Sequence, residues 1–186
     1  MSELLKDSLE TATIIDKGDY KYIYHPLSDG IPLLSPKLLD EVAEGLLKII
    51  NWQGAEAIIT IEAMGIPLAT ALSLKTGIPL NIVRKRKYGN ANEVIISQKT
   101  GYGASTLYLN GIKRNDKVIV IDCVVSTGGT LISVLQALKN IQANVQDVAC
   151  AYSKAGGKEK VFNETGYEVK TLLDVKVDEN NKVIII

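Results

Sequence analysis

Short apolar runs rich in β-branched side chains recur along the chain and predict buried strands. They cover residues 57–61 (AIITI), 79–85 (PLNIVRK), 117–122 (KVIVID) and 148–152 (VACAY). Between these runs, apolar residues return every three or four positions, which is typical of helices that bury one face. Strands that alternate with helices of about a dozen residues indicate βαβ units, so the pattern predicts an α/β fold with a mostly parallel sheet.

Three helices are predicted, and two of them have clear end signals. Ser35 and Pro36 mark the start of the first, because a serine hydroxyl can cap a helix and proline suits its first position. The second runs from Gly65 to Thr76 and ends at Gly77. The third covers 130–140, and two apolar runs, 169–177 and 182–186, close the chain as strands.

A β-hairpin is predicted between the second and third helices. Its short strands are 94–97 (VIIS) and 106–109 (TLYL), and the sequence between them, QKTGYGAS, predicts an exposed glycine-rich tip.

Composition and charge limit the class of protein. The 186 residues suit one domain, and 46% hydrophobic with 23% charged residues is typical of a globular protein. Because Lys+Arg and Asp+Glu balance at 21 each, we expect no overall attraction to nucleic acid or membranes, so any anion site must be local. The charged start of the chain and the two cysteines in or beside apolar runs favour a cytoplasmic protein without disulfides.

The richest chemistry follows the strand 117–122. Asp122 ends the run, and Ser126, Thr127, Gly128, Gly129 and Thr130 follow it. Hydroxyls, backbone amides and a helix start together form a cradle for one phosphate group. The spacings GxxxxGK[ST] and GxGxxG are absent. An acid pointing at the phosphate would repel it, so we expect Asp122 to accept hydrogen bonds from sugar hydroxyls; the alternative is an Asp that caps the next turn. The stretch therefore predicts a ribose 5-phosphate site.

Two other strand ends carry weaker signals. The turn EAMG (62–65) could bring backbone amides toward an anion, although most turns of this kind only connect a strand to a helix. The basic run RKRK (84–87) could be a solvated patch, but its place at a strand end in a charge-balanced chain favours an anion site.

The stretch VIVIDCVVSTGGT resembles the phosphoribosyl-pyrophosphate signature of type I phosphoribosyltransferases. SDGIPLL (28–34), EAMG, VRKRKY (83–88) and TGYGASTLYLNGIKRNDKVIVID are similar to segments of the adenine enzymes, and their order and spacing look closest to the archaeal hypoxanthine/guanine phosphoribosyltransferases. The resemblance implies the type I phosphoribosyltransferase fold: one domain, 1–186, with a mostly parallel central sheet flanked by helices, a flexible hairpin lid over about 88–109 and a small hood.

The resemblance also implies an activity. The family transfers 5-phosphoribosyl from phosphoribosyl pyrophosphate to a purine with Mg²⁺ bound through the substrate, and its members form homodimers. For this chain it implies IMP or GMP formation from hypoxanthine or guanine; the alternatives are an adenine enzyme and a non-enzymatic module that senses phosphoribosyl pyrophosphate or a nucleotide.

Residue roles follow from the same resemblance. The catalytic residues would be Asp122 and the lid residue Tyr102. Asp122 and Cys123, with the loop from Ser126 to Thr130, would bind the ribose and 5′-phosphate. The pyrophosphate would contact Glu62, Ala63, Met64, Gly65, Arg84, Lys85 and Lys87. The purine would contact Leu33, Val124 and Lys154. A lysine can only donate, which favours a 6-oxopurine, although Lys154 could equally be a surface lysine in a loop.

Three positions depart from the family pattern. Cys123 replaces the second acid, Met64 replaces an arginine, and Gly101 replaces a glutamate of the lid. Ser126 is not an acid either, but the adenine enzymes also lack an acid at this position. A neutral thiol is a poor Mg²⁺ ligand and cannot accept a strong hydrogen bond from a ribose hydroxyl, which motivates the sensing alternative. The single histidine, His25, is expected to be structural or on the surface.

Overall fold

A six-stranded sheet forms the centre of the computed structural model, which describes residues 2–18, 20–100, 103–154 and 156–186. The strand order is β10-β9-β8-β7-β3-β4, and every neighbouring pair is parallel except β10 and β9. The strands are β3 (Ala57–Ile61), β4 (Leu80–Val83), β7 (Lys117–Val125), β8 (Asn144–Lys154), β9 (Lys170–Val177) and β10 (Val183–Ile185). The predicted α/β fold with a mostly parallel sheet is confirmed.

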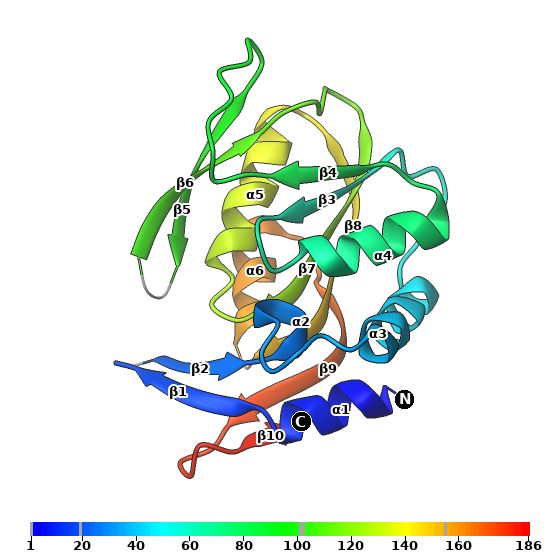
Figure 1. Cartoon of the computed structure of the whole chain (residues 1–186). Helices are drawn as coiled ribbons and strands as arrows, with labels where there is room; N and C mark the ends of the chain where they lie inside the picture. The colour runs from blue at the N-terminus through cyan, green and yellow to red at the C-terminus, as the bar shows by residue number, and fades with distance from the viewer. Residues whose placement is uncertain (1, 19, 101–102, 155) are drawn as a thin grey trace.

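Helices cover both faces of this sheet (Figure 1). One layer contains α1 (Glu3–Glu10), α3 (Pro36–Ile49) and α4 (Ile66–Thr76); the other contains α5 (Gly129–Asn140) and α6 (Gly157–Thr165). Alternate side chains of a strand enter opposite layers: Ile119 and Ile121 of β7 pack with the first, Val118 and Val120 with the second. This double burial explains why the strands are continuously apolar in sequence.

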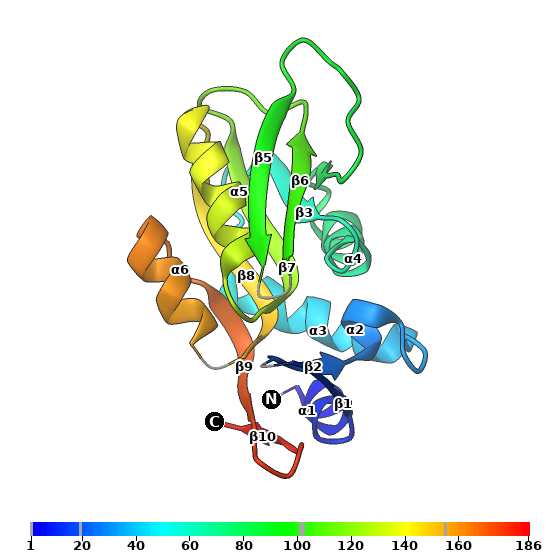
Figure 2. The same cartoon turned by 90° about the vertical axis from the view of Figure 1, so that its left-hand side faces the viewer.

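Two hairpins lie outside the central sheet. The strands β5 (Val94–Thr100) and β6 (Gly103–Leu109) pair with each other and stand beside α5 (Figure 2). The strands β1 (Thr13–Lys17) and β2 (Tyr20–Tyr24) form the second hairpin, followed by the short α2 (Pro26–Asp29). We call β1 and β2 the hood, because they lie across the end of the sheet where β7 and β8 finish (Figure 1).

Helix ends agree with the local sequence signals. The Ser35 hydroxyl accepts a hydrogen bond from the Lys37 amide at the start of α3, and Pro36 is its first residue. Gly77 ends α4 in the left-handed conformation, with φ of 73°.

Some elements differ from the sequence prediction. Helix α1 was not predicted, the small hood was implied by the family resemblance but its strands were not located in the sequence, and α6 occupies a stretch that the sequence suggested was a loop. Strand β7 continues beyond Asp122 to Val125, and β5 and β6 extend into the predicted tip. These segments are short or carry many charged residues, so their structure depends on packing against distant elements.

His25 is structural. It is fully buried, its Nδ1 accepts from the Leu27 amide at the start of α2, and its Nε2 lies 2.8 Å from Ser8 Oγ. Burial lowers the pKa of His25 to about 4, so the ring is neutral at physiological pH. Among the described residues, no helix is both long and apolar enough to cross a membrane.

Candidate functional site

The site lies at the carboxyl end of β7, where parallel sheets commonly bind ligands. The chain leaves β7 at Val125, turns through Ser126, Thr127 and Gly128, and enters α5 at Gly129. Gly128 has φ of 75°, a left-handed conformation that glycine adopts without steric cost. We call residues 126–130 the phosphate loop, because their hydroxyls and amides stand at the N-terminus of α5.

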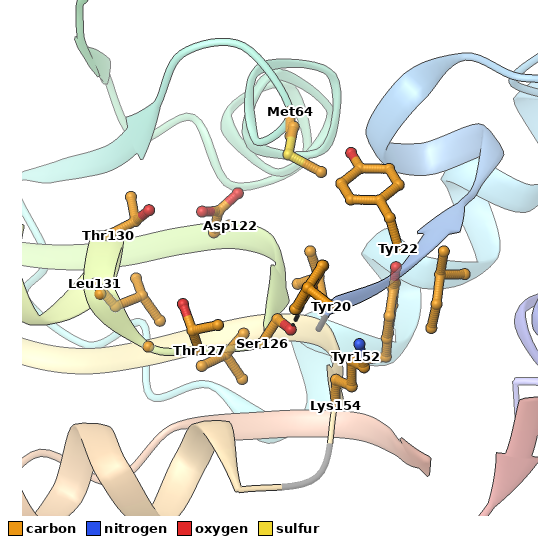
Figure 3. Close-up of a pocket in the computed structure, with 15 residues that line it drawn as sticks. Tyr20, Tyr22, Met64, Asp122, Ser126, Thr127, Thr130, Leu131, Tyr152 and Lys154 are labelled. Atoms are coloured by element: carbon orange, nitrogen blue, oxygen red, sulfur yellow. Dashed lines mark hydrogen bonds between the residues drawn. The ribbon is translucent and has the colours of Figure 1, made fainter. Parts of the chain in front are cut away.

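Two clefts meet at this loop. The first, about 660 Å³ including space open to solvent, lies between the phosphate loop and the hood; the second, about 780 Å³, lies between the turn after β3 and the β5–β6 hairpin. Asp122, Met64 and Thr130 line both clefts. Asp122 lies between Met64 and Thr130 in the close-up (Figure 3).

The Asp122 carboxylate is held in a dry environment. It is 8% exposed, and its Oδ1 accepts a hydrogen bond of 2.8 Å from the Cys123 amide. Burial raises the pKa of Asp122 to about 7, and the bond from Cys123 opposes this only in part. An acid with such a pKa at the wall of a cleft is a candidate functional group.

Cys123 is not part of the site, which corrects the prediction that it contacts the ribose. Its side chain is fully buried and lines neither cleft. The thiol donates to the Met64 carbonyl at 2.9 Å and lies 3.4 Å from the Leu27 carbonyl. Consecutive side chains of a strand point to opposite faces, so Cys123 must face away from the cleft that Asp122 lines. Burial also raises the pKa of the Cys123 thiol, which keeps it neutral.

The turn after β3 forms one wall of the second cleft. Glu62, Ala63 and Met64 line it, and the Glu62–Ala63 peptide bond is cis. Gly65 packs behind this turn against Thr60 and Asp122. The predicted segment EAMG is therefore brought next to the phosphate loop.

The basic run after β4 is only partly in the site. Lys85 lines the second cleft. Arg84 Nε donates to Glu62 Oε2 at 2.8 Å, and the Lys85 amide donates to the same oxygen at 3.0 Å. These bonds, the backbone one first, lower the pKa of Glu62. Lys87 is exposed and lines neither cleft, so its contact with pyrophosphate stays a prediction.

The hood supplies aromatic residues that the sequence reading did not identify. Tyr20 and Tyr22 of β2 line the first cleft. The Tyr20 hydroxyl lies 2.6 Å from Ser126 Oγ, a contact drawn in Figure 3 between residues far apart in the chain. The alternation YKYIY (20–24) was the available signal, since it places Tyr20, Tyr22 and Tyr24 on one face of a strand.

Lys154 and Val124 line the first cleft, as predicted for purine contacts. The Lys154 ammonium lies 3.9 Å from the centre of the Tyr20 ring and donates to the Lys21 carbonyl. Burial, followed by repulsion from Lys21, lowers the pKa of Lys154. Leu33 is different: the residue is 83% exposed and lines neither cleft, so the structure gives no support to its purine contact, which stays a prediction. The loop before α3 directs it to solvent.

The β5–β6 hairpin closes the second cleft through Gln98 and Ser105. The predicted lid residues Gly101 and Tyr102 lie outside the described residues, so the catalytic role of Tyr102 stays a prediction.

The described residues contain no group of three or more His, Cys, Asp or Glu side chains that could hold a metal ion. Mg²⁺ usually combines one or two carboxylates with water and substrate phosphates. Asp122 is the carboxylate common to both clefts, whereas Glu62 is occupied by Arg84 and Lys85. The residues therefore fit a Mg²⁺ ion carried mainly by the phosphates of a ligand.

A strand-end carboxylate beside a glycine- and hydroxyl-rich loop, at the N-terminus of a helix on a parallel sheet, is the arrangement with which α/β proteins hold phosphate-bearing ligands. Comparison with known proteins is more specific. Residues 33–183 match the phosphoribosyl transferase domain, and the chain belongs to this family.

Similar sequences and similar solved structures both belong to phosphoribosyltransferases. The hypoxanthine/guanine phosphoribosyltransferase of Methanothermus fervidus is 51% identical over 185 residues, which cover 100% of this chain and 98% of the relative. The enzyme of the same name from Methanocaldococcus vulcanius is 48% identical over 182 residues, 98% of this chain and 100% of the relative. A crystal structure of adenine phosphoribosyltransferase from Thermoanaerobacter pseudethanolicus has a TM-score of 0.77 at 19% identity, covering 94% of this chain and 99% of the other. The type I phosphoribosyltransferase fold is thereby confirmed.

Proposed function

We propose that the protein is a purine salvage enzyme that transfers the 5-phosphoribosyl group from phosphoribosyl pyrophosphate to hypoxanthine or guanine, giving IMP or GMP and pyrophosphate. The full-length relatives with this name support the substrate class. The observation that carries the proposal is Asp122, which lines both the cleft of the phosphate loop and the cleft beside EAMG. A ligand with a 5′-phosphate in one cleft and a pyrophosphate in the other would place its ribose at this carboxylate.

In the proposed reaction, the bond between ribose C1 and a pyrophosphate oxygen breaks, and its electron pair leaves with the pyrophosphate. A purine ring nitrogen forms the new bond to C1 and loses its proton to solvent. Positive charge develops on the ribose between these events, and ionised Asp122 would stabilise it from a site with little water. The phosphate loop would hold the 5′-phosphate through its amides and the hydroxyls of Ser126, Thr127 and Thr130.

The pyrophosphate would bind in the second cleft, against Ala63, Met64 and Lys85. When bound, Mg²⁺ supplies charge neutralisation of the leaving pyrophosphate. Arg84 is held by Glu62 within the chain, so we propose that it reaches a pyrophosphate only by exchanging this partner, or across a homodimer interface. Measurement of the molar mass in solution tests the dimer.

We propose that Lys154 determines the preference for 6-oxopurines. Its ammonium lies at the wall of the first cleft and can only donate, which suits the acceptor oxygen of hypoxanthine and guanine and not the amino group of adenine. The adenine phosphoribosyltransferase structure from Thermoanaerobacter pseudethanolicus is 19% identical to this chain, so the likeness supports the fold and not the choice of base. The sensing alternative rested on the loss of the second acid at Cys123, but Cys123 is buried and lines neither cleft, so this substitution leaves the cleft walls unchanged. We further propose that the chain is a single domain located in the cytoplasm.

The test is an assay of the purified protein with phosphoribosyl pyrophosphate, Mg²⁺ and each of hypoxanthine, guanine and adenine. We expect IMP and GMP as products. The reaction with adenine should be at least about tenfold slower, because the partly buried Lys154 ammonium would face the amino group of adenine, which is also a donor. Absence of nucleotide from every base would overturn the enzyme proposal, and AMP as the main product would overturn the base assignment.

A further inference from the structure

Gln98 interrupts the apolar face of β5 where this strand passes the phosphate loop. Val94 and Ile96 alternate toward α5 and the core beneath it, and Gln98 is the next residue on that face. It is nevertheless only 8% exposed. Burying an amide costs free energy unless its hydrogen bonds are made, so Gln98 is expected to have hydrogen-bond partners.

Both ends of the Gln98 amide have partners. Its Nε2 donates to Thr130 Oγ1 at 2.5 Å, and its Oε1 accepts from Ser105 Oγ at 3.0 Å. Ser105 stands directly opposite Gln98 in the hairpin, and all three residues line the second cleft. The amide therefore joins both strands of the hairpin to the last residue of the phosphate loop.

From this geometry we infer that Gln98 is a positioning residue, which directs the hydroxyl proton of Thr130 toward the 5′-phosphate. The inference deepens the proposed function and rests on it. An amide nitrogen only donates, so Thr130 Oγ1 accepts from Gln98 and keeps its single proton for another acceptor. A phosphate oxygen in the loop is such an acceptor. An amide rotated by half a turn would instead accept the Thr130 proton; in the orientation that the structure has, the Ser105 hydroxyl donates to Oε1 and leaves Nε2 for Thr130.

The same contact couples the hairpin to the phosphate. When Thr130 donates to a phosphate oxygen, its oxygen becomes a better acceptor for Gln98, since hydrogen bonds in a chain strengthen one another. A bound 5′-phosphate thus strengthens the hydrogen bond between Thr130 of α5 and Gln98 of the β5–β6 hairpin. No corresponding contact runs from Gln98 to the turn at EAMG in the described part of the chain, so pyrophosphate binding does not use it.

Binding of two probes tests the inference, with ribose 5-phosphate and Mg²⁺-pyrophosphate titrated separately by calorimetry. Gln98→Met keeps the size of the side chain and removes both bonds. We expect the Kd for ribose 5-phosphate to rise about tenfold, as for the loss of one hydrogen bond to a charged group, and the Kd for pyrophosphate to change less than about twofold. Gln98→Glu, which accepts from Thr130 and adds negative charge, should weaken ribose 5-phosphate binding further than Gln98→Met.

Three controls separate positioning from general support of the fold. Gln136→Met, on the exposed face of the same helix α5, should bind both probes like the wild type. In a Thr130→Val background, Gln98→Met should cause no further loss of ribose 5-phosphate binding, because the hydroxyl that it orients is gone. Ser105→Ala removes only the hydroxyl that donates to Gln98 Oε1. It should weaken ribose 5-phosphate binding less than Gln98→Met does, and it can be measured even if Gln98 variants fold poorly.

The outcomes are distinct. If the wild type binds ribose 5-phosphate and Gln98→Met binds it equally well, the inference is wrong although the proposed function stands. Equal weakening of both probes, or additive losses in the Thr130→Val background, would also overturn it in favour of a merely structural amide. A wild type that does not bind ribose 5-phosphate would overturn the proposed function itself.

Discussion

The backbone of Gly65 packs against the carboxylate of Asp122, so closely that a Cβ atom at Gly65 would lie 3.1 Å from Asp122 Oδ1 and 2.1 Å from Thr60 Oγ1. Thr60 cannot move freely, because its hydroxyl donates to the Ile121 carbonyl at 2.8 Å. Helix α4 therefore begins as close to the acid as the backbone allows, and glycine is the residue that permits this approach.

We expect Gly65→Ala to lower the free energy of unfolding by roughly 1–3 kcal/mol, as overpacking of a tight site does, and to weaken ribose 5-phosphate binding by displacing Asp122. Chemical denaturation and calorimetry measure the two effects. Gly45→Ala in α3 is the matched control: it meets the end of the flexible Leu172 side chain, so its cost should be offset by the helix preference for alanine. A Gly65→Ala variant as stable and as tightly binding as wild type would contradict the role of this contact.

Asp122 should make stability depend on pH. Because burial raises its pKa from 3.8 to about 7, the folded chain binds more protons than the unfolded chain between these values. The contribution of Asp122 to stability is therefore full below about pH 4 and declines as the pH rises toward 7.

Asp122→Asn keeps the acceptor for the Cys123 amide but cannot ionise. We expect the difference in free energy of unfolding, variant minus wild type, to be larger at pH 8 than at pH 5 by at least about 1 kcal/mol. The variant should also lose activity. Urea denaturation at the two pH values measures the difference. Asp147→Asn serves as the control, because Asp147 is equally buried but forms a salt bridge with Lys170 at 2.6 Å. Loss of this salt bridge should destabilise the protein at both pH values. A difference between wild type and Asp122→Asn that stays constant with pH would rule out the assigned pKa.

Tyr20 and Ser126 share a hydrogen bond of 2.6 Å, and under the proposed function we expect a phosphate bound by the Ser126 hydroxyl to replace it. We expect Tyr20→Phe to bind ribose 5-phosphate about two- to tenfold more tightly, because a neutral hydrogen bond of about 1 kcal/mol no longer has to break. Titration calorimetry tests this, with Tyr24→Phe as the control from the same strand, since Tyr24 lines neither cleft. Weaker binding by Tyr20→Phe would instead make its hydroxyl a phosphate ligand.

Lys154 should affect the base and not the ribose phosphate. For Lys154→Met we expect kcat/KM with hypoxanthine and guanine to fall about 10- to 100-fold, as for the loss of a charged hydrogen bond, with the Kd for ribose 5-phosphate changed less than about twofold. Lys176→Met, an exposed lysine of β9, is the control for charge. Unchanged kcat/KM for both bases would show that Lys154 does not read the purine.

Much of the fold follows from local sequence patterns. The strands β3 and β4 and the helices α3, α4 and α5 lie where their apolar runs and end signals predicted them. Helix α6 was not predicted, because it begins with the charged stretch GKEK, buries only Gly157 and Val161, and packs Gly157 against the phosphate loop. The small hood was implied only by the family resemblance and was not located from the local pattern, since a two-stranded hairpin is stable only against its neighbours.

The sequence by itself determined the phosphate loop, the strand that ends beside it and the family resemblance, because these depend on residues that are adjacent in the chain. Only the tertiary structure decided that Asp122 faces the clefts while Cys123 faces the Leu27 carbonyl, that Leu33 points to solvent, and that Tyr20 reaches Ser126. The hydrogen bond between Gln98 and Thr130 was likewise decided by the tertiary structure. The physical reason is that such contacts join segments brought together by the packing of separate layers, and no local pattern records which side chains meet there.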